Sequence, residues 1–133
     1  MNKTTPKQAM SMLKKWKELL GLQHWVVELR IAEAADLGPL QSHLVGSAQS
    51  SYKNLMCIMH VALHRSPEEV DCTILHELLH MMITPLETVA VIGMGSMGKQ
   101  AQGVLKEFLE QQCEILTIQL ERAIVRIVEK EKV

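Results

Sequence analysis

Apolar residues recur at helical spacing over residues 6 to 20. Nearly every third or fourth position in this stretch is hydrophobic, and this spacing places the apolar side chains on one face of a helix. The positions are Met10, Leu13, Trp16, Leu19 and Leu20. Gly21 follows directly, where a glycine often ends a helix. The pattern predicts an amphipathic helix that ends near residue 20.

From residue 25 the hydrophobic pattern changes from helical spacing to alternation. Val27, Leu29 and Ile31 are separated by Glu28 and Arg30. Alternation of apolar and polar residues is typical of a strand with one buried face. We therefore expect a half-buried strand here.

Two further β-compatible runs follow, after the break that the Gly38-Pro39 pair makes in the chain. They cover residues 44 to 52 and 55 to 63, and Lys53-Asn54 separates them. So short a connection favours an antiparallel hairpin.

The remainder of the chain is predicted to be largely helical. Ser66 can cap a helix, Pro67 suits its first position, and Glu69 stands where a capping box requires it. These residues predict a helix over 67–82, which Pro85 should end. Residues 86–98 receive no assignment, and helical periodicity then continues from Lys99 to Glu129.

The order of elements is a helix, three strands, a helix, a loop and a long helix, which defines an α+β fold. A chain of 133 residues has room for one core. We therefore expect a single domain over residues 1–133.

Composition indicates an ordinary soluble protein, with 47% hydrophobic residues, 22% charged residues and a formal net charge of -1. Basic residues are interspersed with acidic ones, so no nucleic-acid partner is expected. Purely apolar runs fall far short of the roughly 20 residues that span a bilayer, and the N-terminal MNKTTPKQAM lacks a signal peptide's apolar stretch. Three cysteines form neither a C-x-x-C motif nor a disulfide framework. We expect a cytoplasmic protein without membrane contact.

The helix predicted over 67–82 carries an H-E-x-x-H motif, within the segment TILHELLH. His76 and His80 lie about one helical turn apart on one face, so that both imidazoles can reach one zinc ion, with Glu77 beside them to polarise water. Two unpaired histidines among the apolar residues of this helix would be costly without a ligand or partner. The motif therefore favours a metal site over two ordinary histidines.

A third protein ligand is needed for a hydrolytic zinc site, and the sequence leaves its identity open. The extended pattern H-E-x-x-H-x-x-G-x-x-H is excluded, because Ile83 and Leu86 occupy the positions of its Gly and its last His. The long C-terminal helix offers acidic candidates at Glu107, Glu110, Glu114 and Glu121.

Helical periodicity only partly determines which of these glutamates is the third metal ligand. Glu114 shares a stripe with Ile118 and Val125, which favours an inward position, whereas Glu129 lies with Arg122 and Lys106 on a polar face. A solvated helix charge remains the simple alternative for each of these glutamates.

TILHELLHMMITPLE followed by EQQCEILTIQLERAI resembles the small, phage-type zincin-like metallopeptidases, the minimal gluzincins. In that family a helix, a short sheet, the H-E-x-x-H helix and a glutamate helix form the whole catalytic unit. The resemblance implies a minimal zincin-like fold with His76, His80 and Glu114 as zinc ligands and Glu77 as the general base. Glu110 remains the fallback for the third ligand.

The resemblance also implies hydrolysis of a peptide or protein substrate. Zinc would lower the pKa of its water toward 7, and Glu77 would take the proton and pass it to the leaving amine. An edge strand of the sheet could pair with an extended substrate. His60, His64 and Tyr52 are candidates for an oxyanion donor, but a locally satisfied side chain is the simpler interpretation of each.

Residues 89–98, VAVIGMGSMG, contain a G-x-G-x-x-G pattern of the kind that binds dinucleotides. That function needs a second strand after the glycine turn, and the 35 residues beyond Gly98 are predicted to form one helix. The glycines are therefore interpreted as a loop that lets two helices pack antiparallel, or as a mobile lid beside the cleft.

A second hypothesis is a binding or assembly protein that retains the fold, with or without the metal, as structure only. A homodimer is possible, because a methionine-rich chain can expose an apolar interface. A His, His, Glu site also accepts divalent ions other than zinc.

Overall fold

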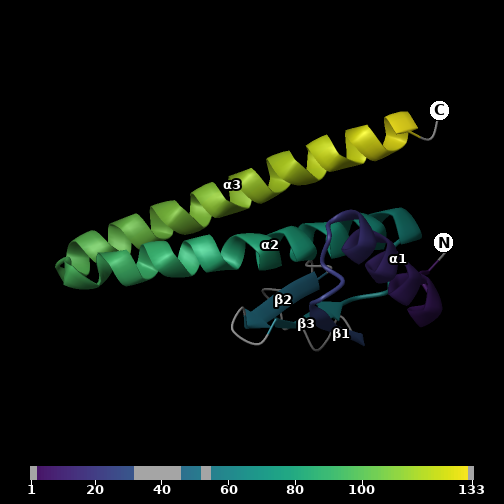
Figure 1. Cartoon of the computed structure of the whole chain (residues 1–133), viewed down its shortest axis with the longest axis horizontal. Coiled ribbons are helices and arrows are strands. Elements are labelled where there is room, and N and C mark those ends of the chain that lie inside the picture. Colours follow the sequence, from purple (N-terminus) through teal and green to yellow (C-terminus); the bar gives the residue numbers. More distant parts are fainter. Residues whose placement is uncertain (1–2, 32–45, 52–54, 132–133) are drawn as a thin grey trace.

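The computed structural model describes residues 3–31, 46–51 and 55–131. The elements are α1 (Pro6–Leu19), β1 (Val26–Ile31), β2 (Gly46–Ser51), β3 (Met56–Val61), α2 (Pro67–Gly93), the 3₁₀ turn η2 (Met94–Ser96) and α3 (Lys99–Glu131). Helices α2 and α3 form a long antiparallel hairpin, and α1 and the sheet lie against the first half of α2 (Figure 1). This arrangement confirms the predicted α+β class.

Helix α1 begins and ends as the sequence predicts. The Thr5 hydroxyl accepts from the backbone N–H of Gln8, and the Gln8 side chain accepts from the N–H of Thr5, which completes a capping box. At the other end Gly21 has a φ of 71°, a left-handed conformation that glycine adopts without a steric penalty.

The sheet has the strand order β1-β3-β2. Strands β2 and β3 pair antiparallel, which confirms the predicted hairpin, although its Lys53-Asn54 turn lies outside the described residues. Strand β1 pairs with β3 in parallel, from Val26 opposite Met56 to Ile31 opposite Val61. The sequence does not reveal this pairing, because β1 and β3 are distant in the chain.

The core lies between one face of the sheet and helices α1 and α2. Cys57, Met59 and Val61 alternate along β3 with less buried residues, and their side chains are almost fully enclosed. Apolar residues of the two helices cover them, among which are Leu13, Trp16, Val70, Ile74 and Leu78. The side of α2 that carries the H-E-x-x-H histidines is left free for α3.

Pro85 does not end α2, so the prediction of a helix over 67–82 was wrong at its C-terminal boundary. The helix continues to Gly93. Proline removes one backbone hydrogen bond and crowds the preceding turn, at a cost of about 3 kcal/mol. Helical hydrogen bonding beyond Pro85 and packing of α2 against α3 offset this cost.

The stretch Pro67–Ser96 is long and apolar enough to cross a membrane, by length and composition alone. Counting purely apolar runs overlooks this property, because Thr84, Pro85 and Glu87 interrupt the hydrophobic sequence. The first half of α2 is nevertheless a core helix, since Ile74 and Leu75 are fully buried against the rest of the domain.

Asp71 joins α1 to α2 through two polar contacts. Its carboxylate accepts from the indole Nε1 of the buried Trp16 at 2.8 Å, and it pairs with the Lys15 ammonium at 2.9 Å. We expect Asp71→Ala to lower the free energy of unfolding by about 1–3 kcal/mol, because it leaves a buried N–H without an acceptor. Asp71→Asn keeps an acceptor oxygen and should cost less than about 1 kcal/mol. Urea unfolding followed by tryptophan fluorescence measures both, and equal losses would contradict the assigned role of the indole bond.

Candidate metal centre

Helix α2 presents the two motif histidines on the side that faces α3. The helix starts as predicted, because the Ser66 hydroxyl accepts from the N–H of Glu69 and Pro67 occupies the first turn. One turn of helix separates His76 from His80, and their Nε2 atoms lie 3.1 Å apart. Both side chains are only partly buried.

Glu114 of α3 completes the group. Its Oε1 lies 3.1 Å from Nε2 of His76, and its Oε2 lies 2.8 Å from Nε2 of His80. The Glu114 side chain is 49% exposed, so its position facing the histidines leaves one side open to solvent. The structure thus brings together the three residues that the resemblance implies as ligands, with their ligand atoms within 4.8 Å of one another.

The spacing of these donor atoms suits a small tetrahedral cation. Two ligand atoms bound to zinc at about 2.0–2.1 Å and at tetrahedral angles lie roughly 3.4 Å apart. Two of the three donor-atom distances in the group are 3.1 Å, which is a few tenths of an ångström below that value. The third, between Glu114 and His80, is shorter at 2.8 Å. Small side-chain shifts would therefore let His76, His80 and Glu114 hold one ion.

Glu121 orients the first histidine. Its Oε2 lies 2.8 Å from Nδ1 of His76, on the far side of the imidazole from Glu114. An Nδ1–H that donates to this carboxylate leaves the Nε2 lone pair directed at the group. Sequence reasoning offered Glu121 only as a possible third ligand. Its i, i+7 spacing from Glu114, which places both on one helix face, was the available signal for a supporting role.

Glu77 lies beside the group in a drier environment. The residue is 8% exposed, and burial raises the pKa of its carboxyl to about 7. His76 opposes this shift, whereas Glu114 and Glu121 add to it. Glu77 also raises the pKa of the buried Cys57 thiol on β3, after the larger effect of burial. The Glu77 carboxylate is thus electrostatically coupled both to α3 and to the sheet.

Burial also lowers the pKa of His80, although the nearby Glu114 carboxylate opposes the shift. A lower pKa favours the neutral imidazole, which is the form that binds metal ions.

Other candidates from the sequence lie outside this group. Glu107 and Glu110 are exposed, and so is His64. His60 follows Met59 on β3 and belongs to the opposite face of the sheet from the core side chains, so it points away from α2. Tyr52 lies outside the described residues.

The glycine pattern joins two helices rather than a strand and a helix. Residues up to Gly93 belong to α2, η2 follows, and α3 begins at Lys99. A dinucleotide site would require a strand before the glycines and another after the helix, and the described residues around the motif form neither. The interpretation as a connection between antiparallel helices is confirmed.

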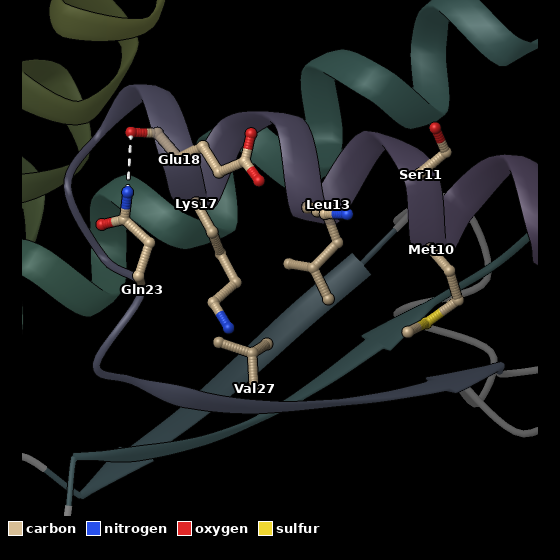
Figure 2. Close-up of a pocket in the computed structure, with 8 residues that line it drawn as sticks. Met10, Ser11, Leu13, Lys17, Glu18, Gln23 and Val27 are labelled. Atoms are coloured by element: carbon tan, nitrogen blue, oxygen red, sulfur yellow. Dashed lines mark hydrogen bonds between the residues drawn. The ribbon is translucent and has the colours of Figure 1, made fainter.

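A groove in the described part of the chain lies away from this group. It has a volume of about 520 Å³ and runs between α1 and β1, over Leu13 and Val27, with Lys17 reaching into it (Figure 2). None of the metal-site residues lines this groove.

No family model, no curated protein and no solved structure matches this chain. Function must therefore be inferred from the site itself.

The contact between His76 and Glu121 predicts an effect on metal affinity. We expect Glu121→Ala to weaken zinc binding by about 10- to 100-fold, because the imidazole loses its orienting partner. Glu121→Gln retains an acceptor oxygen and should weaken binding less. Competition with a chromogenic chelator measures these affinities.

Glu110→Gln is the matched control, since Glu110 is an exposed glutamate one turn before Glu114. Wild-type affinity in both Glu121 variants would contradict the orienting role.

Proposed function

We propose that this protein is a zinc-dependent, zincin-like metallopeptidase. The observation that carries the proposal is the Nε2, Nε2, carboxylate triangle of His76, His80 and Glu114, with the buried Glu77 next to it. A purely structural metal site has no need of a fourth ionisable group that can exchange protons. The presence of Glu77 therefore favours catalysis over a structural site.

In this proposal His76, His80 and Glu114 hold the metal, and Glu121 fixes the orientation of His76. A bound zinc ion supplies Lewis acidity that polarises a carbonyl and lowers the pKa of water. Glu77 accepts the proton of the attacking water and returns it to the leaving amine.

The sheet supports a role in positioning the substrate. Strand β2 lies at the edge of the order β1-β3-β2 and also contacts α2. Within the described residues its outer edge pairs with no strand, so its backbone groups are available to an extended peptide. A peptide along β2 would pass alongside the helix that carries Glu77.

A binding or assembly protein is the second candidate function, with the metal as a structural element. The observation in its favour is that His60, a candidate oxyanion donor, lies on the face of β3 that points away from α2. In this case the metal joins α2 to α3, and Glu77 has no chemical role.

Metal content tests the site directly. After exhaustive dialysis we expect about one zinc ion per wild-type chain by elemental analysis, because three protein ligands hold the ion. His80→Ala and Glu114→Ala each remove one ligand and should lose or greatly weaken retention. Folded wild-type protein that neither retains nor takes up zinc would overturn the proposal.

Glu77→Gln separates the two candidate functions. The variant should keep its zinc and its fold, because Glu77 is not a ligand, while hydrolysis of a peptide library falls by at least about 100-fold. Glu110→Gln controls for loss of a nearby charge and should cleave as wild type. Equal cleavage by Glu77→Gln and wild type would refute the assigned base, and a zinc-loaded wild type that cleaves no peptide favours the structural role.

A further inference from the structure

The outer face of α3 is apolar, and it lies opposite the metal centre. Leu116 follows Glu114 by two residues, which is about 200° around a helix, so it points away from α2. Six of the seven large apolar side chains that α3 exposes lie at least about 100° from Glu114 around the helix, and Val104 lies about 80° from it, at the border with the α2 side. The seven are Val104, Leu105, Phe108, Ile115, Leu116, Leu120 and Ile127. We define these residues, with Gln112, Gln119 and Ala123 between them, as the α3 stripe.

On a helix at a protein surface the charged residues usually face solvent, whereas in the first two thirds of α3 they face α2. Between residues 100 and 121 the charged residues are Lys106, Glu107, Glu110, Glu114 and Glu121. All of them lie within about 80° of Glu114 around the helix, on the α2 side. Lys106, for example, lines a hollow together with Thr84 and Glu87 of α2. The outward half of residues 100–121 therefore carries no charge, and Arg126 is the first charged residue on that side beyond it. Among the described elements only α2 has extensive contacts with α3 (Figure 1).

The exposed area is large enough to form an interface. Phe108 is 57% exposed and Val104 is 68% exposed. The large apolar side chains of the stripe together expose on the order of 600 Å², at the upper end of the largest patches on monomeric proteins. The amides and alanine between them bring the stripe close to the roughly 800 Å² that each partner buries in a standard interface.

The order of residues in the stripe is self-complementary when two copies run antiparallel. With a twofold axis between Ile115 and Leu116, Phe108 faces Ala123 of the other copy, so that a large side chain meets a small one. Gln112 faces Gln119, and the two amides can exchange hydrogen bonds. Val104 faces Ile127, and Leu105 lies level with Arg126, a charged residue on the same outward side of α3. A twofold axis between the two antiparallel helices generates each of these residue contacts twice, as an isologous interface requires.

We propose that two copies of this chain associate through their α3 stripes, antiparallel and centred between Ile115 and Leu116. The two glutamines favour this occupant over lipid, because an amide in hydrocarbon lacks the partner that the other copy provides. The metal centre lies on the other side of α3, so it stays open in the dimer, and the proposal is independent of the catalytic one.

Sedimentation velocity at micromolar concentration tests association. The wild type should sediment with twice its chain mass of 15.0 kDa. Leu116→Glu should raise the dimer Kd by at least about 100-fold, because the axis would bring two carboxylates together in an apolar seam. The control is Val89→Glu, since Val89 is 68% exposed on α2, outside the stripe, and should leave the dimer intact. A monomeric wild type, or a Leu116→Glu variant that remains dimeric, overturns the proposal.

Cross-linking with a short bismaleimide tests the register, and it decides the question should Leu116→Glu fail to fold. Ile115→Cys should cross-link to itself. Val104→Cys and Ile127→Cys should cross-link only when the two variants are mixed, above the background that wild type shows from its native cysteines. Self-cross-linking of Ile127→Cys indicates a parallel pair and overturns the register.

Flotation with phosphatidylcholine vesicles distinguishes a lipid occupant. The wild type should remain with the soluble fraction. Flotation of a protein that sediments as a monomer assigns the stripe to a membrane and overturns the dimer.

Discussion

The contact between the Glu114 carboxylate and the two imidazoles of α2 determines how the long helices are joined. Thr117 is the one residue of α3 that is completely buried. Its hydroxyl donates a hydrogen bond to the backbone carbonyl oxygen of Cys113 in the same helix. Thr117 lies between Glu114 and Glu121, the two residues that reach His76. At this level polar side chains, rather than an apolar seam, bring the helices together. Apolar contacts return toward the C-terminus, where Ile124, Val125 and Val128 pack against the core.

A polar joint of this kind has an electrostatic cost. The carboxylates of Glu77, Glu114 and Glu121 are close enough that the latter two raise the pKa of the first. Even two protonated imidazoles offset only part of the charge of three ionised carboxylates, and burial lowers the pKa of His80. A divalent cation at the triangle would offset as much of this charge without protonating either histidine. Metal binding and the docking of α3 on α2 are therefore coupled in the proposed site, since each stabilises the other.

Local rules predicted the elements of this fold but not every boundary or pairing. Ser66 and Pro67 mark the start of α2 through contacts with residues a few positions away, so the sequence alone reveals it. Pro85 misled the prediction, because its local cost is outweighed by packing along α3. The parallel pairing of β1 with β3 depends on residues about thirty positions apart, for which a strand pattern carries no information.

The site shows the same division between local and long-range information. The spacing of His76 and His80 on one helix is local, and their Nε2 atoms meet as expected. The choice of Glu114 rather than Glu110 depends on how far α3 is shifted along α2, which helical periodicity does not determine. Glu110 is one turn earlier, on nearly the same face, and it is exposed outside the ligand group. The orienting role of Glu121 follows from the same shift, because it brings the next inward glutamate level with Nδ1 of His76.

The placement of the ionisable groups also explains why α3 exposes its apolar side. A helix that turns Glu110, Glu114 and Glu121 toward its neighbour must direct the opposite half of its surface to solvent, and that half holds Phe108 and Leu116. Rotating α3 to bury these side chains would move Glu114 and Glu121 away from the histidines. The polar centre and the apolar exterior are therefore two consequences of one helix orientation, and a partner that covers the outer face would stabilise the orientation that the site needs.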